Sequence, residues 1–366
     1  MTTRRQFIEI TAALGASLAV SPGRALGAMA PQKVSRTRLV LGCAVRATVL
    51  GEPRAAGEAC DFALDAVTRV DDELSLFLPG SALSRLNREG STDQAPESLR
   101  ICLAHALEMA RASEGAFDPT VEPLLQLVAR SFRERGGPPS EDELASARAK
   151  VGFTQVWMSG SRVRLPKDVA LTLNAIAKGY AMDEARAALQ AHGASEVLVA
   201  ASGDMAVGQG RWNLAMQNPL RPDELLERPP FHPPPGGMGA SGGYMNSFTL
   251  DRSWHHILDP RTGHSPTHFA GVVVSASSAI EADALGTATL VLPEKDAVAL
   301  ADARGAGTID PRRAYALAAI GNGHMQRLAA AVAVKRDRIA EIRRANRRVA
   351  LCIDRVAVVA AAMTQE

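Results

Sequence analysis

The sequence predicts an α+β fold, and two observations lead to that class. Segments with apolar residues at helical spacing are interspersed with short segments rich in β-branched residues. The two kinds of segment do not follow the strict strand–helix–strand order that a parallel sheet requires, and no internal repeat is visible. Helices packed with a sheet of mixed connectivity are therefore expected.

Composition is that of an ordinary globular protein. The chain has 366 residues, of which 46% are hydrophobic and 22% charged, enough for one large or two smaller domains. The net charge of +2 gives no reason to expect a nucleic-acid partner. None of the four cysteines forms a C-x-x-C pair, so neither a zinc ribbon nor a redox pair is indicated.

The N-terminus carries the pattern of a targeting segment. Arg4 and Arg5 precede a mildly apolar run at 10–20, and Ala28-Met29-Ala30 offers a cleavage site. The run is shorter than the roughly 20 apolar residues that span a bilayer. Residues 1–30 are therefore expected to be a twin-arginine signal that sends the protein to the periplasm, with membrane association only through an uncleaved signal.

The first half of the chain is expected to be mostly helical after an initial strand. Pro, Gly and polar residues interrupt the apolar pattern at two places, which predicts turns there. The expected elements are a strand at 38–50, a helix at 56–70, a turn at 76–81, a short helix at 81–87, a helix at 96–113, a turn at 115–120 and a helix at 121–130.

The second half mixes short strands and helices. Ser140 and Glu143 form a capping box that starts another helix. The Pro/Gly-rich residues 220–239 are expected to form a long surface loop. The Ala/Arg-rich residues 326–350 favour a solvated helix face. The remaining expected strands are at 156–158, 163–165, 169–173, 196–201, 211–217 and 271–276. Residues 174–180 lead into a helix that ends at about residue 191, and another helix is expected at 278–290.

A polar stretch at 254–263 surrounds a Pro and a Gly, which hold its side chains in a fixed turn. His256 has the pKa range of a general base, and the adjacent His255 is expected to face the opposite side. A zinc cluster of these two histidines with His264 and His268 is an alternative, but it lacks a known ligand spacing. Asp259 is the residue before a proline, a position typical of a turn former.

A site for a hard cation is the most specific chemical prediction. Asp283 and Thr287 stand four apart, so they share one face of the expected helix. With a backbone carbonyl from the irregular turn at Ala175, they offer the oxygen ligands that Mg²⁺ prefers. The alternative is a charge near a helix N-terminus and a packed threonine. Lys178 lies at a helix start, where anions bind, although an isolated lysine is more often a surface residue.

Ordered motifs along residues 37–300 resemble the ApbE family of FAD:protein FMN transferases. Each motif combines Gly or Pro with polar residues, and they occur in the family's order. They are L-F-L-P-G-S-A-L-S-R-L-N at 76–87, G-A-F-D-P-T-V at 115–121, L-N-A-I-A-K-G-Y-A-M-D at 173–183, S-G-D-M at 202–205, H-I-L-D-P-R-T-G at 256–263 and A-D-A-L-G-T-A at 282–288.

The resemblance implies a single T-fold-like core with a helical subdomain over 37–305, followed by an atypical basic helical segment at 306–366. It implies that FAD is cleaved and that its FMN half moves to a Thr or Ser hydroxyl of a target flavoprotein, with release of AMP. Mg²⁺ would bind Asp283, Thr287 and the carbonyl of Ala175, and His256 would assist the acceptor hydroxyl. The FAD site would be lined by Leu41, Phe77, Ala116, Phe117, Asp118, Thr172, Lys178 and Ile257.

Two departures and two alternatives accompany the resemblance. Leu41-Gly42-Cys43 stands where the family usually has Met-Gly-Thr, and Ser202-Gly203-Asp204 replaces Gly-Gly-Asp. An FAD pyrophosphatase, in which water replaces the acceptor hydroxyl, would use the same site. A non-catalytic exported flavin-binding protein would not need Asp283, Thr287 and His256 together, so their joint presence favours an enzyme.

Overall fold

The centre of the fold is a six-stranded antiparallel sheet. The computed structural model describes residues 31–215, 217–219, 221–225 and 232–305. Each strand pairs only with antiparallel neighbours, in the order β1-β2-β6-β7-β10-β11. The strands are β1 (Gln32–Val40), β2 (Cys43–Gly51), β6 (Val197–Ala201), β7 (Asp204–Val207), β10 (Gly236–Ser241) and β11 (Val272–Ala276). The α+β class expected from the sequence is confirmed.

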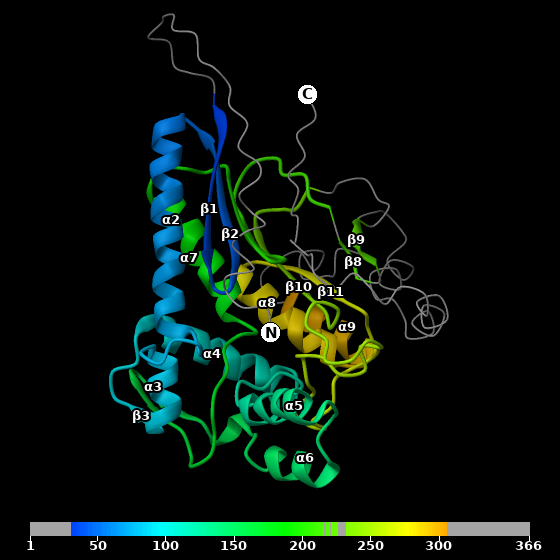
Figure 1. Cartoon of the computed structure of the whole chain (residues 1–366). Helices are drawn as coiled ribbons and strands as arrows, with labels where there is room; N and C mark the ends of the chain where they lie inside the picture. The colour runs from blue at the N-terminus through cyan, green and yellow to red at the C-terminus, as the bar shows by residue number, and fades with distance from the viewer. Residues whose placement is uncertain (1–30, 216, 220, 226–231, 306–366) are drawn as a thin grey trace, which may run out of the picture. The chain divides into compact units, whose positions relative to one another are not determined.

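Three helices form a layer on this sheet (Figure 1). α2 (Pro53–Leu74) packs on β1 and β2, α7 (Ala177–Ala191) on β6 and β7, and α8 (Ala279–Val291) on β10 and β11. α7 contacts both other helices, so the three lie side by side over one face. α9 (Glu294–Gly305), which the sequence did not indicate, packs on α8. Leu64, Leu189 and Leu285 belong to the buried apolar cluster between these layers.

A helical subdomain is inserted between α2 and α7. Its helices are α3 (Ala82–Glu89), α4 (Glu97–Ala112), α5 (Glu122–Arg135) and α6 (Glu141–Arg148), with a single 3₁₀ turn at Phe153–Gln155. A small sheet of β3 (Ser91–Thr92), β4 (Trp157–Ser159) and β5 (Arg162–Arg164) accompanies them. The capping box of Ser140 and Glu143 is present, as the sequence predicted. α4 joins the subdomain to the core because it packs on α2 and α8.

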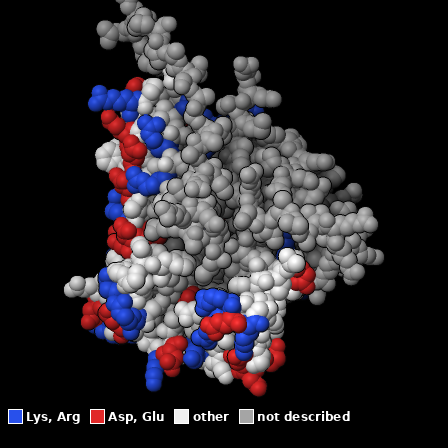
Figure 2. All heavy atoms as spheres, in the orientation of Figure 1, with Lys and Arg blue, Asp and Glu red and all other residues white. Residues whose placement is uncertain are grey.

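Charged side chains of both signs alternate over α2 and the helical subdomain (Figure 2). Exposed ion pairs such as Arg38 with Asp65 and Arg135 with Glu143, 2.7 and 2.8 Å apart, belong to this surface. Exposed pairs of this kind contribute little to stability because water screens them. None of the helices in the described ranges combines the length and apolar composition needed to cross a bilayer.

The single strand expected at 38–50 is a hairpin, so that prediction was wrong. Val40 pairs with Cys43, which leaves Leu41 and Gly42 as a two-residue turn with φ of 55° and 71°. Positive φ at both positions is the geometry that tight hairpins require. A leucine rarely adopts it, which is why the alternating apolar pattern gave no sign of a break here.

The long surface loop expected at 220–239 was also wrong. Residues 221–225 form β9, which pairs with β8 (Gln217–Asn218), and residues 236–241 form β10 inside the main sheet. A Cβ at Gly237 would lie 2.1 Å from Ser278 backbone atoms, and one at Gly239 would lie 2.5 Å from the Ala282 carbonyl. These glycines allow the strand to approach the α8 backbone, and composition alone does not separate that use from a loop.

Two other expected strands are not formed. Residues 169–173 are mostly buried but irregular, and at Leu171 the Asn87 side chain takes the place of a strand partner: it donates to the Leu171 carbonyl and accepts from its N–H, each at 2.8 Å. Of the strand expected at 211–217, residues 211–213 are irregular, and the ladder pairing begins at Gln217. The signal at 1–30 and the basic segment at 306–366, with its stretch at 326–350, lie outside the described residues and stay predictions.

Candidate active site

Two tight turns meet at one end of the main sheet. Leu41-Gly42 joins β1 to β2, and Ser202-Gly203 joins β6 to β7, with positive φ at all four residues. Val45 pairs with Ala201, so the start of β2 lies beside the end of β6. Cys43 and Ser202 are consequently in side-chain hydrogen-bonding contact. The two departures from the family pattern are thus neighbours in space.

The crossing of α7 and α8 places the predicted metal ligand Asp283 beside the 173–183 segment, which includes the start of α7. A Cβ at Gly179 would lie 2.2 Å from the Ala279 carbonyl oxygen, so the close crossing requires glycine. At this crossing the Gly179 N–H donates to Oδ2 of Asp283 at 2.9 Å. The Asp283 side chain is buried in the protein. The sequence-based hypothesis required these two segments to meet, and they do.

A buried ion pair adjoins Asp283. Lys178, on the first turn of α7, pairs with Asp204, the first residue of β7. The side chain of Asp204 is only 1% exposed, whereas that of Lys178 is 31% exposed. Asp204 was not among the predicted site residues. Its position directly after a Ser-Gly turn at the end of a strand was the available signal.

Burial and charge control ionisation in this cluster. Burial, together with the nearby Asp204 carboxylate, raises the pKa of Asp283 to about 7, although Lys178 and the Gly179 N–H oppose the rise. Burial also raises the pKa of Asp204, against the opposing effect of Lys178. For Lys178, burial lowers the pKa, but Asp204 and Asp283 outweigh it and the pKa is raised. The ammonium is therefore charged at neutral pH.

The donor set fits a hard divalent cation. When Asp283 is ionised, the cluster holds two buried carboxylates and one ammonium, and an added cation would balance the remaining negative charge. Thr287 lies one turn beyond Asp283 on α8 and is half-buried, and Ala175 lies in the turn before α7. Within the described ranges, no three His, Cys, Asp or Glu side chains are placed to share a metal. Carbonyl, hydroxyl and substrate oxygens would therefore complete the shell, as is common for Mg²⁺.

The two adjacent histidines have different environments, as the sequence predicted. His255 is 3% exposed. One of its ring nitrogens lies 3.0 Å from the Pro266 carbonyl, and the other accepts from the Ile257 N–H at 3.3 Å. His256 is exposed, and its backbone N–H donates to the Asn246 carbonyl at 3.0 Å. Partial removal from water lowers the pKa of the His256 imidazole, and the charges of His255 and Lys178 lower it further. The hydrogen bond with the Asn246 backbone opposes this shift. His256 is thus neutral at pH 7 and able to accept a proton.

The four-histidine zinc alternative is wrong. His264 stacks against Trp254 with ring centroids 5.2 Å apart and lies 3.5 Å from Glu141, while His268 is exposed. The described residues contain no metal-binding cluster of this type. Asp259 is a turn former, as its place before a proline indicated, because its carbonyl accepts from the Gly263 N–H at 2.7 Å.

The predicted FAD residues fall into a buried and an exposed group. Asp118 is buried; its Oδ1 accepts from Thr120 at 2.8 and 2.6 Å, and its Oδ2 accepts from the Phe153 N–H at 3.0 Å. Burial raises its pKa, and these hydrogen bonds oppose the rise. The Phe77 side chain is 85% exposed on the turn before α3. Of the others, Ala116, Phe117 and Thr172 are buried, and Leu41 and Ile257 are half-buried.

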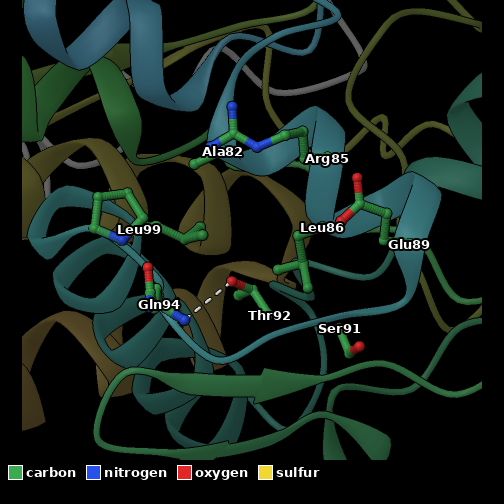
Figure 3. A pocket seen from close by; sticks show the side chains of 9 residues that line it. Ala82, Arg85, Leu86, Glu89, Ser91, Thr92, Gln94 and Leu99 are labelled. Atoms are coloured by element: carbon green, nitrogen blue, oxygen red, sulfur yellow. Dashed lines mark hydrogen bonds between the residues drawn. The ribbon is translucent and has the colours of Figure 1, made fainter.

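Two surface hollows lie elsewhere, on the helical subdomain. The one in Figure 3 is lined by Arg85, Glu89 and Gln94 among others, and its volume of about 30 Å³ admits one or two water molecules. A second, of about 650 Å³, is lined by Arg88, Arg164 and neighbours. Neither is lined by a predicted site residue. The buried charges and the histidine lie at the end of the sheet, so we place the site there.

The fold is shared with ApbE proteins of known structure, and the sequence is similar to that of proteins with an assigned activity. An ApbE protein from Thermotoga maritima superposes with a TM-score of 0.64 at 28% identity, covering 71% of this chain and 87% of its own. The flavinyl transferase ApbE of Pseudomonas stutzeri superposes with a TM-score of 0.65 at 27% identity, covering 75% and 89%. An FAD:protein FMN transferase from Klebsiella pneumoniae is 31% identical over 274 residues, which cover 70% of this chain and 77% of that protein.

The family model of the ApbE family matches residues 41–309. The chain belongs to the ApbE family, and the resemblance drawn from its motifs is confirmed.

Proposed function

We propose that the protein transfers FMN from FAD to a Thr or Ser hydroxyl of a target flavoprotein and releases AMP, with Mg²⁺ as cofactor. The observation that carries the proposal is the contact of Asp283 with Gly179, beside the pair of Lys178 and Asp204. This arrangement brings carboxylate oxygens and the Lys178 ammonium together at one point. Phosphoryl transfer requires such groups, because metal ligands and positive charges stabilise the phosphate charge. Relatives from Klebsiella pneumoniae and Vibrio cholerae bear the name FAD:protein FMN transferase.

The buried charges would act on the pyrophosphate of FAD. Asp283, Thr287 and the Ala175 carbonyl would hold Mg²⁺, which when bound neutralises phosphate charge. Lys178 has three N–H donors on a side chain that is 31% exposed, so its ammonium can keep one donor on Asp204 while others face a phosphate oxygen. The protein thereby positions the FMN-side phosphorus and stabilises the AMP leaving group.

His256 would act on the acceptor. Its neutral, exposed imidazole takes the proton of the hydroxyl as the hydroxyl oxygen attacks the FMN-side phosphorus. A new phosphoester bond forms, the bond between the two phosphates breaks, and AMP leaves. The exposed Phe77 ring offers a flat apolar surface for the flavin, with the remaining FAD contacts from Leu41, Ala116, Phe117, Asp118, Thr172 and Ile257.

We also propose export to the periplasm through the twin-arginine route. Arg4 and Arg5 before the apolar run support it. Replacing both arginines by lysine should retain the protein in the cytoplasm, as measured by cell fractionation. Equal periplasmic amounts of variant and wild type would argue against this route.

The proposal is tested by incubating the protein with FAD, Mg²⁺ and candidate exported flavoproteins. Mass spectrometry should show an acceptor heavier by one FMN, and the label should map to a Thr or Ser. Asp283→Ala should abolish labelling while the circular dichroism spectrum is unchanged. Release of FMN and AMP with every acceptor unlabelled would instead indicate the pyrophosphatase alternative.

A further inference from the structure

A carboxylate with almost no contact with water stands at the base of the site. Asp204 is 1% exposed, and the protein offers it two partners: the Lys178 ammonium and the backbone N–H of Ala240. Burying a carboxylate is costly, and an ion pair in such a position often stabilises a fold no better than apolar side chains would. Stabilisation of the fold therefore does not explain why an aspartate occupies this position.

The backbone of Asp204 is fixed from both sides. Asp204 pairs with Ala201 across the tight turn of the β6–β7 hairpin, and the next residue, Met205, pairs with Met238 of β10. Gly203 has a φ of 109°, and a Cβ there would lie 3.1 Å from the Cβ of Ala240. The turn thus has little room to move. The carboxylate is anchored by the central part of the sheet.

Lys178 is the flexible member of the pair. Its ammonium is carried on a four-carbon stem with several rotatable bonds, and the helix that carries it begins only one residue earlier, at Ala177. The nearby Asp283 acts on Lys178 through its charge, whereas the ion pair of the ammonium is with Asp204. The position of the ammonium is consequently set by the partner that cannot move.

We infer that Asp204 is a positioning residue of the transfer reaction: it holds the Lys178 ammonium at the base of the site so that its free N–H donors face the pyrophosphate of FAD. The inference rests on the proposed function. Asp204 and Asp283 then have separate tasks, since one orients the lysine and the other supplies an oxygen to the cation. Asp204 touches neither the substrate nor the reacting atoms.

Asp204→Asn is the first test, because it keeps the shape and removes the charge. We expect kcat to fall by about 10- to 100-fold, the usual effect of losing a residue that orients a ligand group. The KM for FAD should not rise, because a negative charge near the phosphates is also removed. A loosened pocket would raise KM instead, so the split between kcat and KM separates positioning from a purely structural role.

A double-mutant cycle shows whether Asp204 acts through the lysine. In the Lys178→Met background, Asp204→Asn should cost less than about twofold in kcat, because there is no ammonium left to orient. The matched control is Glu281→Gln, which breaks the half-buried pair of Glu281 with Arg304, 2.7 Å apart on α8 and α9. It should lower stability without the selective loss of kcat.

Labelling of Lys178 with an amine-reactive reagent, quantified by mass spectrometry on the FAD-free protein, tests the restraint without any transfer. Asp204→Asn should label several-fold faster than the wild type, because the lysine loses its counter-ion. Equal labelling rates, an unchanged kcat in Asp204→Asn, or the same fractional loss in the Lys178→Met background would each overturn the inference. If Asp204→Asn labels faster than the wild type but the wild type transfers no FMN, only the proposed function would be contradicted.

Discussion

Asp283→Asn is expected to stabilise the protein at about pH 8 in the absence of FAD and Mg²⁺, and to abolish transfer. The pKa of the Asp283 carboxyl rises from 3.8 to about 7 on folding, mainly because the group is buried. Ionising it therefore costs about 4 kcal/mol more in the folded than in the unfolded chain. The amide carries no charge, so the variant avoids this cost while its oxygen can still accept from the Gly179 N–H.

The sign of the pH dependence follows from the direction of the shift. The folded protein holds the Asp283 proton more tightly, so the contribution of this group to the stability of the wild type falls as pH rises from about 4 to about 7. The advantage of Asp283→Asn should approach about 4 kcal/mol at about pH 8 and nearly vanish at about pH 4. Urea-induced unfolding of both proteins at several pH values measures it.

Two comparisons make this test sharper. Glu281→Gln makes the same chemical change on the same helix, but Glu281 is paired with Arg304, so this variant should lose stability. Added Mg²⁺ should raise the stability of the wild type and not that of Asp283→Asn, because only the carboxylate would bind it. A variant Asp283→Asn less stable than the wild type at about pH 8 would refute the view that this carboxylate is held at a cost for function.

His256→Ala should lower the transfer rate more than it lowers FAD affinity, as measured by flavin fluorescence; equal losses in both would argue for a binding role. His255→Ala should lower the free energy of unfolding by about 1–3 kcal/mol, because it leaves the Pro266 carbonyl without its partner; urea unfolding no different from the wild type would contradict this. Gly237→Ala should lower the free energy of unfolding by at least about 1–3 kcal/mol, since its Cβ would lie 2.1 Å from Ser278. Thermal unfolding measures this, and an unchanged midpoint would contradict it by showing that β10 can shift.

Local patterns predicted the elements whose signals are contained in a few consecutive residues. The capping box of Ser140 and Glu143 started a helix where expected. The four-residue spacing of Asp283 and Thr287 was correctly placed on a helix, because the 3.6-residue period is a property of the chain itself. The opposite environments of His255 and His256 also followed from neighbouring positions.

Strand pairing was the first thing that local patterns missed. Leu41 gave no turn signal, and the hairpin became visible only when Val40 paired with Cys43. Gly237 and Gly239 indicated a loop by composition, although they serve a strand that touches the α8 backbone. Whether a glycine loosens the chain or admits a neighbour depends on what packs against it, and that neighbour is distant in the sequence.

The sequence by itself determined the family and the α+β class, and it supplied most of the residues proposed for the site, because motifs and periodicities are contained in short stretches. Only the tertiary structure decided which charges meet. Asp283 accepts from Gly179 across 104 positions of sequence, and Lys178 meets Asp204 across 26. Two buried carboxylates around one lysine perturb each other through space, and the strength of that effect depends on burial and distance, which no local pattern contains.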